Sequence, residues 1–102
     1  MLSDRELLRH IRDEMEFLIA DSREMTLSLF LSDETRKRAY ARSLEIIGEA
    51  AKALSPELTL NHPDVEWRNM AAMRNRLIHG YFSVDYSIVW DAAVTRFRDS
   101  ST

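Results

Sequence analysis

Glycine and proline, the two residues that most often interrupt regular structure, are almost absent from this chain. Each occurs only twice in 102 residues, so few positions force a helix to end. Apolar residues instead recur every three or four positions, which is the spacing of one buried face of an α-helix. The sequence therefore predicts an all-α fold built from long helices and short connections.

Four main helices follow from this spacing, and residues 1–102 are expected to form a single domain. Because the connections between the helices are short, the sequence favours an antiparallel bundle. The expected helices are residues 4 to about 21, Ser32 or Asp33 to Ser55-Pro56, a third ending near His79, and a fourth from Ser83 or Asp85 through Phe97. The first should begin with a capping box made by Ser3 and Glu6. The buried stripe expected on the second consists of Tyr40, Leu44, Ile47, Ala51 and Leu54.

Two places leave room for a short extra helix. The segment 21–33 can either extend the first helix or form a packed connector. The apolar residues of that connector are Leu27, Phe30 and Leu31. Further on, Ser55-Pro56 is expected to cap one more helical turn, because proline is favoured at the first position of a helix.

The two glycines have different expected roles. Gly48 lies inside the second predicted helix, where glycine costs about 1 kcal/mol relative to alanine. The expected reason is the close approach of a neighbouring helix, which the small residues Ala50 and Ala51 also favour. Gly80 follows the third helix, where a left-handed C-terminal residue is common.

Arg74 occupies an unusual place on the third helix. At roughly 100° per residue, it falls near the middle of an apolar arc. The arc consists of Trp67, Met70, Ala71, Leu77 and Ile78. A charge there is costly unless it is paired or reaches a polar cavity. If Arg74 has no functional role, it reaches out to solvent or pairs with a buried carboxylate such as Glu49.

His79 and Asn75 share a different face of the same helix, because they are four residues apart. On an ideal helix His79 lies roughly 140° from Arg74, so local geometry alone does not bring the two together. The length of Arg74, unwinding before Gly80, or a second subunit could do so. His79 could act as a general acid or base near neutral pH, although a lone histidine at a helix end is more often a capping or surface residue.

Composition excludes several classes of protein. There are no cysteines, which excludes a disulfide scaffold and a thiolate metal site, and suits a reducing cytoplasm. The three histidines have no metal-binding spacing, so neither a metal nor a cofactor is expected. No apolar run approaches the roughly 20 residues of a membrane span. The net charge of −3 argues mildly against nucleic-acid binding.

Three blocks of sequence, taken in order, resemble one known family. The block "RNRLIHGY", residues 74–81, matches the R-x4-H-x-Y motif of HepT-like toxins, within the broader HEPN class of ribonucleases. The block "LEIIGEAAKALS", residues 44–55, resembles the motif on the second long helix of that family. Residues 65–90 look like its third and fourth helices. The final "RFRDSST" stops where the family pattern continues as helix.

The resemblance implies a HEPN-like helical-bundle homodimer with a composite site at the subunit interface, and cleavage of RNA without a metal. It implies that Arg74 and His79 are catalytic, with Asn75 as a polar helper. Beside the resemblance, we expect Arg76 and Glu49 to support this site. It also implies a nucleotidyltransferase antitoxin that transfers AMP to Tyr81. The residue types suit this chemistry, because RNA supplies its own 2′-OH nucleophile. His79 could move the proton while Arg74 holds the phosphate oxygens.

Two other functions stay open. The chain could be a non-catalytic binding module that partners a nucleotidyltransferase, or a plain helical interaction protein. The intact motif favours the ribonuclease, and the acidic net charge is the main point against it. The interaction protein ranks last, because it leaves Arg74 in the apolar arc without a purpose.

Overall fold

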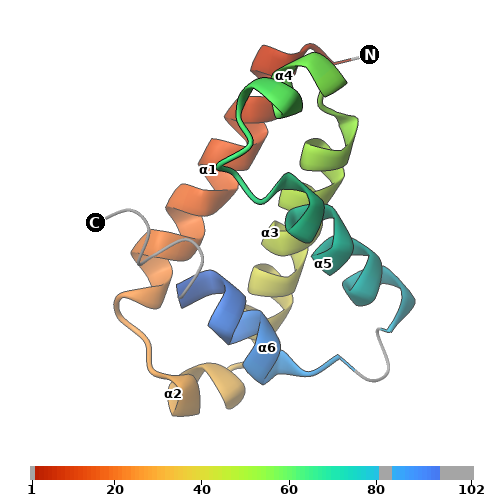
Figure 1. The fold of residues 1–102 in the computed structure, drawn as a ribbon. Helices are drawn as coiled ribbons and strands as arrows, with labels where there is room; N and C mark the ends of the chain where they lie inside the picture. The colour runs from red at the N-terminus through yellow and green to blue at the C-terminus, as the bar shows by residue number, and fades with distance from the viewer. Residues whose placement is uncertain (1, 81–83, 95–102) are drawn as a thin grey trace.

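The structure, a computed structural model that describes residues 2–80 and 84–94, is helical and has no strand within those ranges (Figure 1). Its helices are α1 (Asp4–Ser22), α2 (Leu27–Leu31), α3 (Glu34–Ala53), α4 (Pro56–Asn61), α5 (Trp67–His79) and α6 (Tyr86–Asp91). A wider, π-type turn continues α6 over residues 92–94. The all-α prediction is confirmed, and the two short helices α2 and α4 lie where extra turns were expected.

α3 is the central helix. Its most extensive contacts are with α5 and α1, and it also touches α2 and α6, which touch each other. Figure 1 shows α1 and α3 side by side and running in opposite directions, as an antiparallel bundle predicts. The two faces of α3 therefore have different partners, α1 on one and α5 on the other.

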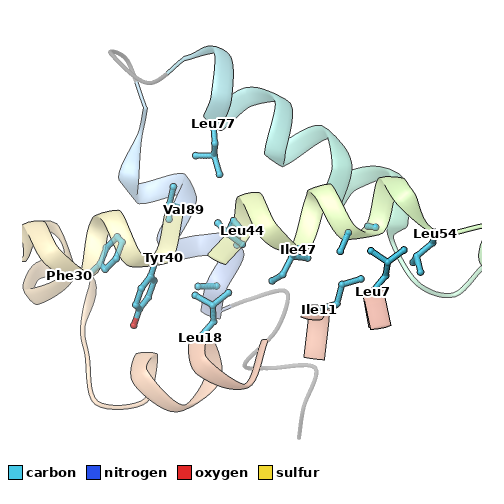
Figure 2. Close-up of a cluster of buried hydrophobic side chains, with 14 residues drawn as sticks. Leu7, Ile11, Leu18, Phe30, Tyr40, Leu44, Ile47, Leu54, Leu77 and Val89 are labelled. Atoms are coloured by element: carbon cyan, nitrogen blue, oxygen red, sulfur yellow. The ribbon is translucent and has the colours of Figure 1, made fainter. Parts of the chain in front are cut away.

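The hydrophobic core forms where α1, α5 and α6 meet α3 (Figure 2). The stripe predicted on the second helix is buried as expected: Tyr40, Leu44, Ile47, Ala51 and Leu54. Other helices contribute Leu7, Ile11, Leu18, Phe30, Leu77 and Val89. Aromatic rings fill the end of the core near α2, where the Tyr40 ring centroid lies 4.7 Å from that of Phe30 and 6.4 Å from that of Trp90.

A polar cluster joins the end of α1 to the start of α3. The hydroxyl of Tyr40 donates to the Asp21 carboxylate at 2.6 Å, and Arg36 donates to the same oxygen at 2.9 Å. Arg36 also donates to Asp33 at 2.8 Å. The Tyr40 side chain is fully buried. This burial, and next the bond to Asp21, raise the pKa of Tyr40 above its ordinary value.

Side-chain caps fix the helix ends. The capping box is confirmed: Glu6 N–H donates to the Ser3 hydroxyl at 3.2 Å, and Ser3 N–H donates to the Glu6 carboxylate at 2.8 Å. The Asp4 carboxylate accepts bonds from the backbone N–H and the hydroxyl of Ser55, at 3.0 and 2.6 Å, which ties the start of α1 to the start of α4. The caps of α3 and α6 are Asp33 and Asp85.

Two expectations are wrong. In the connector only Phe30 is buried, whereas Leu27 and Leu31 are 41% and 40% exposed, because a five-residue helix presents only one narrow face to the core. Gly80 is not left-handed, since its φ is −118°. Its N–H donates to the Arg76 carbonyl at 3.1 Å, so a regular helical bond closes the last turn. Within the described ranges, no helix is long and apolar enough to cross a membrane.

Candidate functional site

The candidate site lies on α5, at the place where α5 packs most tightly on α3. A Cβ atom added to Gly48 of α3 would lie 2.4 Å from the Cβ of Arg74 and 2.4 Å from the carbonyl oxygen of Met70. Real Cβ atoms do not come this close to other heavy atoms. The close helix approach expected at Gly48 is therefore confirmed, and the residue that stands against it is Arg74.

Arg74 lies among core residues, as its position on the apolar arc predicted. Leu77 is buried, and Trp67 and Met70 pack against the core, whereas Ile78 at the edge of the arc is 37% exposed. Arg74 itself is partly buried. Its Nη1 donates to the Asn75 side-chain oxygen at 3.2 Å. Its Nε is buried and has no hydrogen-bond partner within the described part of the chain.

The predicted pairing of Arg74 with a buried Glu49 is wrong. Glu49 is exposed, and the ion pairs among the described residues do not include one between these two side chains. The reason is helical geometry. Glu49 follows Gly48 by one residue, which turns its side chain roughly 100° away from the line where α3 meets α5.

α3 and α5 together have a face that points away from the core. Around each helix at roughly 100° per residue, Ile47 and Leu77 lie on the core side, while Glu49 and Asn75 lie on the opposite side. We call this opposite side the uncovered face. Its exposed residues include Arg38, Arg42, Glu49, Arg68, Asn75 and Ile78. It carries both signs of charge, including an ion pair between Arg42 and Glu45 at 3.2 Å.

Arg76 is exposed and borders two hollows on the other side of α5. The larger, of about 680 Å³, has apolar walls from α1, α3 and α5, including Met15 and Met70. The smaller, of about 380 Å³, lies between the end of α5 and α6 and includes Asp85. The pKa of Asp85 is lowered chiefly by its bond from the Ser87 hydroxyl, with a small contribution from the charge of Arg76.

The backbone of His79 ends α5, four residues after Asn75. The side chain of His79 lies outside what the structure describes, as do Tyr81, Ser83 and Phe97. Their assigned roles stay predictions. The described residues do bring Gly48, Arg74 and Asn75 together at one place, from two helices that are well separated in sequence.

Sequence reasoning missed the direct contact between Gly48 and Arg74. Periodicity predicted both features separately, a tight approach on α3 and an arginine in the apolar arc of α5, but it contains no signal for the register between two helices. Among the residues that the structure describes, no group of three or more His, Asp or Glu side chains is arranged to hold a metal ion.

Comparison with known proteins places these features in a family. The family described as "Ribonuclease HepT-like" matches residues 7–101. "Putative RNase TTE0752" of Caldanaerobacter subterraneus subsp. tengcongensis is 45% identical, over 89% of this chain and 81% of its own length. "Probable ribonuclease HepT" of Thermococcus cleftensis is 40% identical, over 86% and 80%. "Putative RNase MJ0127" of Methanocaldococcus jannaschii is 39% identical, over 90% and 76%. No solved structure matches the chain.

Proposed function

This chain belongs to the HepT-like ribonuclease family, and from that premise we propose that it is a metal-independent endoribonuclease, the toxin of a toxin–antitoxin pair. The observation that carries the proposal is the extent of the family match. It runs over residues 7–101 and so includes the whole segment from Arg74 to Tyr81. Relatives named as ribonucleases cover most of the same region.

Arg74 is suited to hold a phosphate. Its Nε is buried and has no acceptor among the described residues, and a buried donor left unpaired costs about 1–3 kcal/mol. A phosphate oxygen would supply that acceptor and would also pair with the charge of the guanidinium. Asn75 accepts a bond from Nη1, so it restrains the guanidinium before RNA arrives. Arg76, exposed on the same helix, adds positive charge for the RNA backbone.

His79 completes the proposed chemistry. RNA carries the nucleophile, its own 2′-OH, and cleavage requires this hydroxyl to lose a proton while the leaving 5′-oxygen gains one. His79 exchanges these protons as general acid and base, and Arg74 stabilises the charge that develops on the phosphate. Neither role uses a metal ion.

A homodimer would complete the site. On an ideal helix Arg74 and His79 are roughly 140° apart, so a single α5 would not aim both at one phosphate. The uncovered face of α3 and α5 carries Asn75 and Ile78 and has charges of both signs. A two-fold interface through such a face would bring the two α5 helices together. Both subunits would then use the same surface, so that each contact occurs twice.

A toxin role implies that the antitoxin inactivates the ribonuclease, and we propose that it does so by transferring AMP to Tyr81. In this step the tyrosine oxygen attacks the α-phosphorus of ATP, pyrophosphate leaves, and the phenolic proton is lost to a base of the nucleotidyltransferase. The AMP phosphate then stands two residues after His79 and near Arg76 in sequence. Its negative charge would pair with arginines that serve RNA and repel the RNA backbone.

The test is RNA cleavage by the purified chain. We expect cleavage of total cellular RNA that persists in excess EDTA and is lost in His79→Ala and Arg74→Ala. His62→Ala and Arg5→Ala, which change exposed side chains outside α5, are the matched controls and should cleave normally. Loss of activity on chelation, restored by Mg²⁺, would contradict the metal-independent mechanism.

The net charge of −3 favours a second candidate, a non-catalytic module that binds a nucleotidyltransferase. In that case the wild-type chain and both α5 variants would leave RNA intact, while all three still form a complex with the nucleotidyltransferase. The same cleavage assay, read beside a binding assay, separates the two functions.

A further inference from the structure

The contact between α3 and α5 at Gly48 involves the backbone of α5 as well as a side chain. A Cβ at position 48 would meet the Met70 carbonyl oxygen at 2.4 Å and the Met70 carbonyl carbon at 3.3 Å. In an α-helix this carbonyl accepts the N–H of residue 74. Gly48 therefore lies against the very turn of α5 from which Arg74 projects, and a flexible side chain cannot relieve the overlap.

The guanidinium of Arg74 forms neither a hydrogen bond nor an ion pair with the described residues of α3. Within the described ranges its one hydrogen bond goes to Asn75, its own neighbour on α5, and it forms no ion pair with another helix. Its Nε is buried and has no hydrogen-bond partner in residues 2–80 and 84–94. The place of Arg74 relative to α3 thus depends on how closely α5 packs, and not on a bond between the two helices.

We propose that Gly48 is a positioning residue for RNA cleavage: the missing side chain lets α5 settle on α3 at the distance that places the Arg74 guanidinium for the phosphate. Any side chain at position 48 pushes α5 outward and carries Arg74 with it. Misplacement of a catalytic group by about 1 Å can cost about 100-fold in rate. The glycine is otherwise unfavourable inside a helix, so this packing role accounts for its presence.

The inference rests on the proposed ribonuclease function, and its test is a double-mutant cycle over Gly48→Ala and Arg74→Ala. Cleavage is measured on a labelled pool of random-sequence RNA 20-mers, and binding on the same pool made with 2′-O-methyl groups, which cannot be cleaved. Alone, Gly48→Ala should lower kcat/KM by about 10- to 100-fold and weaken binding of the uncleavable pool. In the Arg74→Ala background, where cleavage is lost, the same change should alter binding of the uncleavable pool by no more than about 2-fold.

A matched control separates positioning from general loss of stability. Ile47→Val removes one methyl group from a buried neighbour in the same helix and lowers stability without touching the Arg74 contact. It should leave kcat/KM within about 2-fold of wild type. If Ile47→Val reduces activity as much as Gly48→Ala, or if the effects of Gly48→Ala and Arg74→Ala multiply fully, the positioning role is wrong.

If Gly48→Ala does not fold, the contact is tested on stability in the Arg74→Gly background, where one of the two obstructing atoms is absent. In that background Gly48→Ala should regain a cooperative urea transition, and failure to fold there as well would overturn the inference. Failure of the proposed function looks different. In that case the wild-type chain and the Arg74→Ala variant would both leave the RNA pool intact, whatever residue stands at position 48.

Discussion

The hydroxyl of Tyr40 donates to the carboxylate of Asp21 at 2.6 Å, across 19 positions of sequence and between two helices. Arg36 donates to the same carboxylate oxygen. The ring of Tyr40 is at the same time part of the aromatic end of the core, where it is tilted against Phe30 and stacked parallel to Trp90. One residue therefore joins the hydrophobic core to the polar cluster at the end of α1.

Tyr40→Phe should lower the free energy of unfolding at neutral pH by about 1.5–3 kcal/mol, because it removes a hydrogen bond to a charged acceptor and keeps the ring. Urea unfolding followed by circular dichroism measures the change. Tyr86→Phe is the control, since Tyr86 is only partly buried. If the free energy of unfolding falls no more than in the control, the bond between Tyr40 and Asp21 makes no net contribution to stability.

Alkaline pH should destabilise the wild-type chain more than the Tyr40→Phe variant. The folded-state pKa of Tyr40 is raised above the ordinary value of 10.0, first by burial and then by the bond to Asp21. A raised pKa means that the stabilisation is fully present below pH 10.0 and is lost as the pH rises through the folded-state pKa. The stability difference between the two proteins should therefore narrow above about pH 10. A constant difference would contradict this assignment.

Acid should destabilise the start of α3 through Asp33. The backbone N–H of Arg36, and next its side chain, hold the pKa of Asp33 below its ordinary value of 3.8. A lowered pKa means that the stabilisation is present above pH 3.8 and is lost as the pH falls through the folded-state pKa. Asp33→Asn keeps a capping side chain without a titrating group. The urea midpoint of that variant should decline less steeply below about pH 4 than that of wild type.

The dimer predicted through the uncovered face can be broken at one residue. Light scattering at micromolar concentration should give twice the chain mass of 11.9 kDa. Ile78→Glu should give a monomer that cleaves RNA at least 10-fold more slowly, since burying an unpaired charge at an interface is costly. Leu60→Glu alters a more exposed apolar residue on α4 and should change neither the mass in solution nor the rate of RNA cleavage. An active monomer would contradict the composite site.

Modification by a partner nucleotidyltransferase should fall on Tyr81. After incubation with the partner and ATP, intact mass and peptide mapping should place AMP on Tyr81 and show loss of cleavage without unfolding. Tyr81→Phe should escape both modification and silencing. Tyr40 is fully buried and serves as an internal negative. Adducts that persist in Tyr81→Phe, or map to Tyr86, would show that the acceptor is another residue.

Helical periodicity was sufficient to predict the residues that face the core. It gave the α3 stripe, the capping box at Ser3 and the placing of Arg74 among apolar neighbours. It could not say which helix covers which face, because that depends on tertiary register. The Arg74–Glu49 pairing failed for this reason: both side chains belong to the correct pair of helices, yet Glu49 turns toward solvent.

Gly48 shows clearly what could be predicted from the sequence and what could not. Its cost inside a helix predicted a close approach, and the structure confirms one. That the approaching residue is Arg74 follows only from how far α5 is shifted along α3. The connector shows the same limit, because its apolar composition predicted packing for three residues and the short α2 buries only Phe30.

The central place of α3 also sets an order for assembly. α1 precedes α3 in the chain, and its apolar face packs mainly on α3, which ends at residue 53. The pairs α1–α3 and α3–α5 are near neighbours in sequence, a pattern that favours rapid folding. The α1–α3 pair can thus serve as a scaffold on which α5 packs later, and Arg74 reaches its place against Gly48 only when that packing occurs.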